Sequence, residues 1–223
     1  NLSILGGNQK ISHATSLGYY TQDGIMKNSS FERLSLQSNI SSKIASNVTV
    51  RANVNLSAEN RRNQPVGTVI QNAMRIIPIK DENGEYAGPT GNAEWNGNAL
   101  NPVAIINEQS YRMKGFRMLS NISLEWEIIK GLKFKTTGGA ELGYDYNNSY
   151  IPKYKWGMNE SKNTMQSIAS VYEQLYLWDN ILNYDRSFGK HKLNAMVGTS
   201  YQEYKKESVS AAGSGRASEL TTE

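Results

Sequence analysis

The sequence predicts an all-β fold, an antiparallel up-and-down segment of a membrane β-barrel with about eight long strands. Three observations predict it. Apolar and polar residues alternate along runs of about 10 to 16 residues, longer than the five or six usual in soluble sheets. The connections between these runs alternate between short and long. No run of about 18 apolar residues occurs, which excludes a transmembrane helix but not a membrane-spanning strand.

The composition fits thin, half-exposed strands better than a soluble globule. The chain has 223 residues, of which 38% are hydrophobic, and contains 13 Tyr and 19 Gly. It has no Cys, which excludes a disulfide framework and a thiolate metal site within it. The net charge is +4, but basic and acidic residues are interleaved, so we predict no nucleic-acid-binding surface.

Two hairpins are predicted in the first quarter of the chain. Residues 2–6 and 11–20 form the first pair of strands around a turn at 7–9. The second pair covers residues 33–44 and 47–57, where alternation is clearest and one face is apolar. The apolar positions of the latter strand are Val48, Val50, Ala52, Val54 and Leu56.

The same pattern returns after the middle of the chain. Residues 117–128 and 132–146 form a hairpin that turns at Lys130-Gly131. In its first strand, apolar Met118, Ile122 and Leu124 alternate with polar residues. The polar positions of that strand are Arg117, Asn121, Ser123, Glu125 and Glu127.

A last hairpin covers residues 166–185 and 192–202, with a turn at 187–190. The face of its first strand stays ambiguous because Glu173 and Asp179 interrupt an otherwise apolar set. That set is Val171, Leu175, Leu177 and Ile181. We expect a further long connection to open after Glu203.

The connections are sorted by length. Short ones are predicted near 7–10, 43–47, 129–131 and 186–191, and long ones near 21–31, 59–113 and 146–165. Outer-membrane barrels pair short periplasmic turns with long extracellular loops. A β-sandwich has no reason to sort its loops in this way.

The longest connection contains the one predicted helix. Apolar residues recur at helical spacing, Pro65 fits the first turn and Pro78 ends the pattern. The apolar positions are Val66, Val69, Ile70, Ala73 and Ile77. Residues 81–85 are predicted to form a turn, and Asn101-Pro102 is predicted to be another loop element.

Candidate catalytic and metal-binding groups are few. Glu125 and Glu127 could form an acid/base pair, but the alternation explains them as polar residues of one strand face. Asp81, Asn83 and Glu85 imitate the start of a calcium loop, although Gly84 is misplaced and position twelve is Asn92. The two histidines, His13 and His191, have no companions at metal-ligand spacing. We predict no catalytic residue, metal site or cofactor, and hence no enzyme.

Aromatic residues fall toward the predicted strand ends, where a girdle would place them at the lipid headgroups, although ordinary cross-strand packing explains them too. They are Tyr19, Tyr20, Trp126, Tyr144, Tyr146, Trp178, Tyr184 and Tyr201.

Several segments resemble the SusC/RagA family of TonB-dependent outer-membrane transporters, in order and spacing over nearly the whole chain. The segments are Asn1-Leu2-Ser3-Ile4-Leu5-Gly6-Gly7-Asn8, Ser16-Leu17-Gly18-Tyr19-Tyr20, Gln22-Asp23-Gly24-Ile25, Phe31-Glu32-Arg33, Ala73-Met74-Arg75-Ile76-Ile77-Pro78, Asn83-Gly84-Glu85-Tyr86, Asn101-Pro102-Val103-Ala104, Leu182-Asn183-Tyr184 and Phe188-Gly189-Lys190-His191. The resemblance implies that residues 1–223 are a partial section of a 22-stranded barrel.

The same resemblance implies location in the outer membrane and active import of oligomeric nutrients, glycans or peptides, with a SusD-like lipoprotein as lid. The plug domain and the contact with the TonB complex would lie outside this chain. Polar residues predicted to face the lumen are Arg51, Asn53, Arg117, Lys133 and Glu141. Loop aromatics that could stack on a sugar or fill a pocket beneath the lid, or pack against the lid protein, are Tyr86, Trp95, Tyr111, Tyr154 and Trp156.

Two rival hypotheses remain. A passive porin-type barrel would need its strands to close on themselves with a filled interior. A soluble β-sandwich, such as an adhesin or glycan-binding module, would have shorter strands and two sheets packed face to face.

Overall fold

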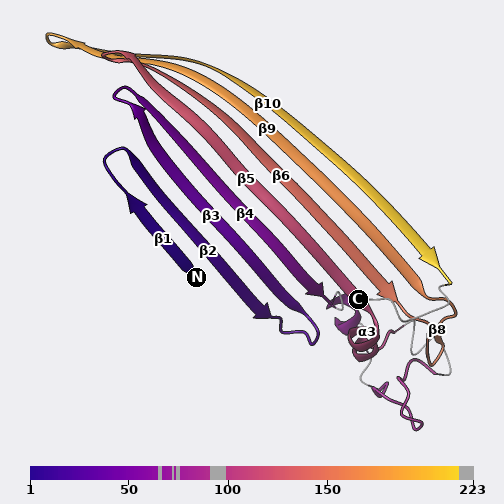
Figure 1. The fold of residues 1–223 in the computed structure, drawn as a ribbon. Helices are drawn as coiled ribbons and strands as arrows, with labels where there is room; N and C mark the ends of the chain where they lie inside the picture. Colours follow the sequence, from indigo (N-terminus) through magenta and orange to yellow (C-terminus); the bar gives the residue numbers. More distant parts are fainter. Residues whose placement is uncertain (65–66, 72, 74–75, 91–98, 216–223) are drawn as a thin grey trace.

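The computed structural model describes residues 1–64, 67–71, 73, 76–90 and 99–215. Eight strands form one antiparallel sheet in the order β1-β2-β3-β4-β5-β6-β9-β10, so neighbours in the sheet are also successive long strands of the chain (Figure 1). The strands are β1 (Leu2–Gly7), β2 (Ile11–Asp23), β3 (Ser30–Ala45), β4 (Val48–Asn63), β5 (Ser110–Ile129), β6 (Leu132–Ile151), β9 (Met165–Phe188) and β10 (His191–Ser214). The predicted up-and-down sheet of long strands is therefore confirmed.

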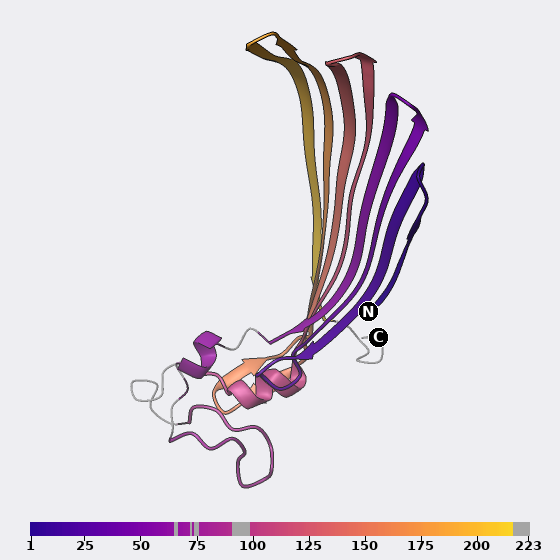
Figure 2. The same cartoon turned by 90° about the vertical axis from the view of Figure 1, so that its left-hand side faces the viewer.

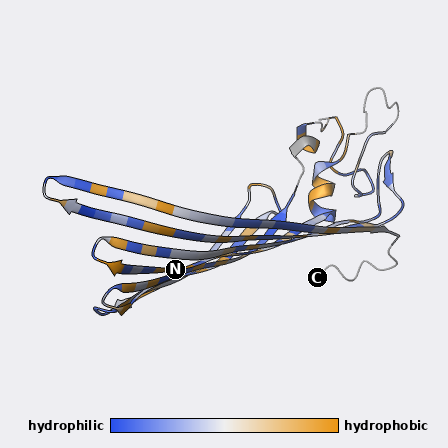
Figure 3. Ribbon diagram, turned by 90° about the horizontal axis from the view of Figure 1, so that it is seen from above, coloured by the Kyte–Doolittle hydropathy of each residue, from blue (hydrophilic) through white to orange (hydrophobic). Residues whose placement is uncertain are grey.

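Register gives the sheet one polar and one apolar face. Residues opposite each other in an antiparallel pair project to the same side, and successive residues alternate sides. Arg51 lies opposite Ser41 and Ser123, whereas Val50 lies opposite Ser42 and Leu124. The pairings continue the same two sides across all eight strands, although β9 and β10 place polar and apolar residues on both of them. Figure 3 shows hydrophilic and hydrophobic residues alternating along the strands.

The apolar face is exposed. Ile122 is 58% exposed, Trp178 58% and Val197 64%, and all three lie on that face. Among the described residues the buried hydrophobic cluster lies in the loops instead, around Ala104, Ile105 and Trp156. A sandwich would cover this face with a second sheet, but the other sheet described here is only the small β7-β8 pair. The exposed apolar face fits contact with lipid.

The turns are staggered along the sheet. Ile11 directly follows the first turn, yet its partner Ser42 precedes the next turn by several residues. The pairs Val48–Trp126 and Leu132–Tyr184 repeat this offset. Each turn is thus displaced by about three to four residues, or roughly 10 to 13 Å, over two strand spacings of about 9.6 Å. If the turns share one level, the strands tilt by between about 45° and 55°, at or slightly above the upper end of the range typical of outer-membrane barrels.

The short turns match the prediction. They lie at residues 8–10, 46–47, 130–131 and 189–190. Gly131 and Gly189 have positive φ, +88° and +58°, which a glycine adopts without steric penalty. The long connections and helices gather at the opposite end of the curved sheet (Figure 2).

Two strand predictions were wrong. β10 does not end near Glu203 but continues to Ser214, which pairs with Met165. Its last part is rich in Ser, Ala and Gly, so alternation of hydrophobicity fades while backbone pairing persists. The connection after β6, predicted to be a loop, contains a small hairpin of β7 (Tyr154–Trp156) and β8 (Asn159–Ser161). Its three-residue strands are too short to show a hydrophobic period.

The helix prediction was partly wrong. Helix α1 (Gly67–Gln71) lies inside the predicted segment, but Ala73 and Ile77 are not helical, and the described part is much shorter. Residues 65–66, 72 and 74–75 lie outside the described residues. A second helix, α3 (Pro102–Glu108), stands where only a loop element was predicted. Neither described helix is long and apolar enough to span a membrane.

Candidate functional site

All five residues predicted to face the lumen lie on the polar face. Their register partners on β5 and β6 establish this from the backbone pairing alone. The pairs are Arg51–Ser123, Asn53–Asn121, Arg117–Gly143, Lys133–Glu127 and Glu141–Leu119. The structure therefore brings these residues together on one surface, as expected if that surface lines a lumen.

Ion pairs cross the strands on this face. Arg51 Nη1 donates to Glu125 Oε2 at 3.0 Å, and Lys133 Nζ lies 4.0 Å from Glu125 Oε1. Lys206 Nζ lies 2.7 Å from Glu173 Oε1. These pairs are exposed to solvent, so each contributes little to stability. Their main effect is to fix where charge stands on the surface.

Arg117 is the most firmly held of these cations. Its Nη2 donates to Asp145 Oδ2 at 2.6 Å, and its Nη1 donates to the carbonyls of Phe116 and Tyr144 at 3.1 and 3.2 Å. A Cβ at Gly143 would lie 3.3 Å from the guanidinium carbon. The missing side chain therefore leaves space in which the guanidinium lies across the neighbouring strand.

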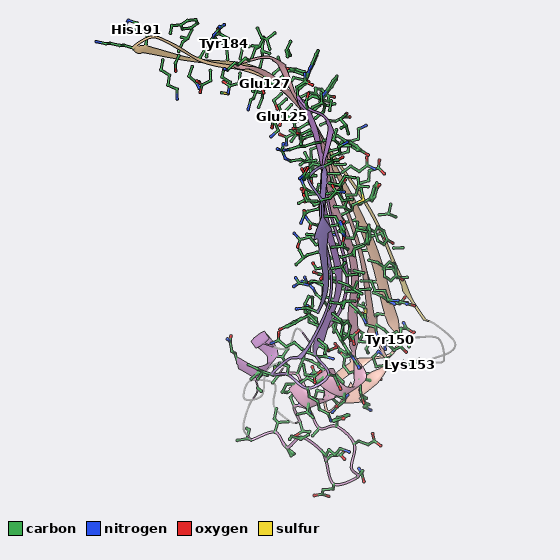
Figure 4. The ribbon with its side chains drawn as sticks, turned by 60° about the vertical axis from the view of Figure 1, so that its left-hand side comes forward. Glu125, Glu127, Tyr150, Lys153, Tyr184 and His191 are labelled. Atoms are coloured by element: carbon green, nitrogen blue, oxygen red, sulfur yellow. The ribbon has the colours of Figure 1, made fainter. Side chains whose placement is uncertain are left out.

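Glu125 and Glu127 lie on the polar face, near the short turns (Figure 4). The Glu125 carboxylate is paired with Arg51, and Glu127 Oε1 accepts a hydrogen bond from the Gly131 N–H at 3.3 Å. Both carboxylates thus serve local contacts in the strand and turn.

The ambiguous strand β9 presents two mixed faces. Glu173 and Asp179 share the polar face with the apolar set predicted beside them, because β9 pairs with β6 in a register that puts odd residues there. Those apolar residues are Val171, Leu175, Leu177 and Ile181. Tyr172, Tyr176 and Trp178 lie on the apolar face.

Aromatic rings of the apolar face form neighbouring sets. Phe116, Tyr144 and Tyr172 are successive register partners toward the long loops. Trp126 and Phe134 are partners close to the short turns. Seven of the eight residues predicted for a girdle lie on this face. Tyr20 does not, because its partner is Arg33 on the polar face.

A pocket of about 540 Å³ lies among the long loops and collects three of the predicted loop aromatics, Tyr86, Tyr154 and Trp156. Its charged lining residues are Asp81, Glu85, Glu108, Lys153 and Lys155. Lys153 lies at the loop end of the sheet (Figure 4). Aromatic and charged groups around one cavity are a common arrangement for holding a polar ligand.

The remaining two loop aromatics stand apart from this pocket. Tyr111 begins β5 and lines a separate cavity of about 230 Å³ at the strand ends. Its hydroxyl donates to Gln109 Oε1 at 2.8 Å. Trp95 lies outside the described residues.

Trp156 is a packing residue rather than an open contact surface. It is 2% exposed, contacts the cluster of Ala104 and Ile105, and stacks on Tyr154 with ring centroids 4.1 Å apart. Most of its indole is therefore covered by other loop residues, and its contact with cargo or lid stays a prediction. Burial raises the pKa of the nearby Glu108 carboxyl, while its hydrogen bond with Trp156 opposes the rise.

Asn101 organises the loops around this pocket. Its Oδ1 accepts from the N–H groups of Val103 and Ala104, both at 3.1 Å, and so caps α3. Its Nδ2 donates to the carbonyls of Ile79 and Ala87, both at 2.8 Å. Sequence reasoning missed this residue, although Asn followed by Pro is a recognised helix start.

The calcium-like segment forms the predicted turn. Asp81 Oδ1 accepts from the N–H groups of Asn83 and Glu85, both at 2.9 Å, and Gly84 has φ +81°. The carboxylate is thus occupied by its own backbone. Within the described ranges, no group of three or more His, Cys, Asp or Glu residues is arranged to hold a metal ion.

Comparison with known proteins identifies relatives along nearly the whole chain. No protein-family model matches it. TonB-dependent receptor P3 of Formosa agariphila is 29% identical over 94% of the chain. TonB-dependent receptor SusC of Bacteroides thetaiotaomicron is 22% identical over 92% of it. The chain spans only 22% of the length of either relative.

Solved structures share the fold. The RagAB peptide importer in its open-open state matches 98% of the chain with a TM-score of 0.82 and 22% identity. A second RagAB structure, described as a peptide transporter, matches with a TM-score of 0.80 and covers the same share of the chain. In each case the chain spans 25% of the matched protein. Over nearly its whole length the chain is therefore similar in sequence to TonB-dependent receptors, including SusC, and its fold matches that of a section of the RagAB structures.

Proposed function

We propose that this chain forms part of an outer-membrane, TonB-dependent importer of oligomeric nutrients, glycans or peptides. The two-faced, tilted sheet is the observation that carries the proposal. An exposed apolar face suits lipid, while a polar face with fixed charges suits the wall of an aqueous lumen. Arg51, Asn53, Arg117, Lys133 and Glu141 would then line that wall.

The loops suggest the outward side. Outer-membrane barrels carry long connections on the extracellular side, so the loop pocket would meet arriving cargo or a SusD-like lipoprotein lid. Tyr86, Tyr154 and Tyr111 are the aromatic residues that remain as candidates for these contacts. Contact with the TonB complex would be made by parts of the whole protein outside this chain.

The orientation can be tested with single cysteines in the full-length protein, expressed in its outer membrane. This chain contributes no thiol of its own. A water-soluble maleimide should label cysteines at Arg51 and Asn55 on the polar face and spare those at Val50 and Val54 on the apolar face. Equal labelling of all four would contradict the assignment of lumen and lipid.

The import activity needs a separate test. Cells that lack the full-length protein should lose uptake of a fluorescent oligomer that the wild type accumulates, and a protonophore should abolish uptake in the wild type. Uptake that persists in the deletion strain, or that ignores the protonophore, would refute energy-coupled import.

A further inference from the structure

A groove of about 540 Å³ lies on the polar face across β1 to β5. Its floor is low because Gly18, Ser35 and Ser57 are successive register partners with small side chains. Arg33 and Arg117 stand beside it, and Gln37 and Asn55 add amide groups. No acidic residue lines the groove among the described residues.

The other arginine of the groove, and Arg61 near it, are neutralised. Arg117 pairs with Asp145 at 2.6 Å, and Arg61 pairs with Glu59 at 2.6 Å. Arg33 has no carboxylate within 4.0 Å among the described residues, because Glu59, its register partner, is bound to Arg61. The groove therefore presents one uncompensated guanidinium.

An aromatic ring stands next to this guanidinium. Tyr20 is the register partner of Arg33 and is 46% exposed on the otherwise polar face. Its ring is tilted against Phe31, with centroids 5.9 Å apart, while Arg61 covers Phe31 at 5.1 Å. Phe31 is therefore in contact with both Arg61 and Tyr20. The Tyr20 ring remains partly exposed, and Arg33 lies opposite it on the neighbouring strand.

We propose that this groove binds a sugar unit that carries a carboxylate, which rests on the proposed import function and names its cargo class. The carboxylate would pair with Arg33, whose fork of N–H donors matches carboxylate geometry. The apolar face of the sugar ring would lie on Tyr20. Hydroxyl groups would reach Ser35, Ser57, Gln37 and Asn55, which offer both donors and acceptors.

Direct binding to the purified full-length protein tests this proposal without relying on transport. The probes are an oligogalacturonate, a neutral galacto-oligosaccharide of equal length and an oligoglutamate, measured by calorimetry. R33Q should weaken oligogalacturonate binding about tenfold or more, because a charge-assisted hydrogen bond is lost. R33K should lose less, and Y20A should weaken both sugars. R186Q, on the apolar face near a short turn, should match the wild type.

The outcomes separate the possible occupants. Unchanged oligogalacturonate affinity in R33Q would overturn the proposal. Preferential binding of oligoglutamate, lost in R33Q, would overturn the sugar assignment in favour of an acidic peptide. A lower melting temperature in R33Q with no change in binding would mean that a carboxylate of the protein itself occupies the groove. Because these readouts are affinities, a failure of uptake alone would count against the importer function and not against the groove.

Discussion

Substitutions of Asn101 should separate its two structural roles, the cap of α3 and the hydrogen bonds to the segments at Ile79 and Ala87. N101A removes the cap of α3, at a cost of about 1 kcal/mol. It also strips the Asn101 donor from the Ala87 carbonyl, at about 1 kcal/mol because Asn101 is only 5% exposed, whereas the Ile79 carbonyl keeps the Ala87 N–H as a donor. The total loss is therefore about 2 kcal/mol of local stability.

N101D should act on one part alone. The aspartate keeps an acceptor for the N–H groups of Val103 and Ala104, and its charge suits a helix N-terminus. It places a carboxylate oxygen where Nδ2 donated. The carbonyl oxygens of Ile79 and Ala87 therefore lose this hydrogen bond and are repelled by the new oxygen. The helix should survive while the neighbouring segments loosen by about 2 kcal/mol.

Hydrogen exchange on the full-length protein in detergent can resolve these parts. In N101D the Ala87 N–H, which donates to Ile79 O at 3.1 Å, should exchange about 30-fold faster. The Ile105 N–H in α3 should keep its protection in N101D and lose it in N101A. N107A, which removes an exposed contact with Tyr86, is the control. Equal acceleration at both amides in N101D would refute the division.

Three further predictions follow from the same geometry. On the apolar face, I122K should destabilise the assembled barrel by about 2–4 kcal/mol if residue 122 lies near the bilayer midplane, whereas N121K on the polar face should be tolerated. The heat-modifiable gel mobility of the full-length protein distinguishes the two variants, and equal behaviour would contradict the assignment of the two faces. G143V should push Arg117 away from Asp145, so the part of the salt dependence of the melting temperature that this ion pair contributes should disappear, as it should in D145N. An unchanged salt dependence would show that the ion pair does not contribute measurably to stability. Because burial raises the pKa of Glu108 above 4.5, its ionisation opposes folding, so protection of the loops from hydrogen exchange should be greatest at low pH and fall as the pH rises through the raised pKa. E108Q should keep the low-pH protection at neutral pH, and a wild-type pH response in E108Q would refute this cause.

The strands could be predicted because their hydrophobic period follows the pleat. Val48 to Leu56 alternate with polar residues since one side of β4 faces each environment, and the partner strands repeat the pattern. Prediction failed where that contrast fades. The last part of β10 is held by pairing with β9 although its side chains are small, and backbone pairing leaves no hydropathy signal.

The candidate site was predictable in its faces but not in its contacts. Arg51 and Arg117 could be placed on the polar side from alternation alone. The groove beside Arg33 could not, because it depends on register, which sets Gly18 against Ser35 and Ser35 against Ser57. The burial of Trp156 could not be predicted for a related reason: a loop aromatic gives no sequence signal of whether it covers a core or faces solvent.

The long connection between β4 and β5 lowers the stability of the fold only slightly through its loop-closure entropy. Closing a loop costs entropy that grows only with the logarithm of its length, so residues 64–109 cost about 2 kcal/mol more than the six-residue connection at 24–29, which was predicted among the long ones. Contacts inside the loops, such as those of Asn101, can offset that difference. The outer loops can therefore lengthen and diverge to meet new ligands while the paired strands beneath them stay the same.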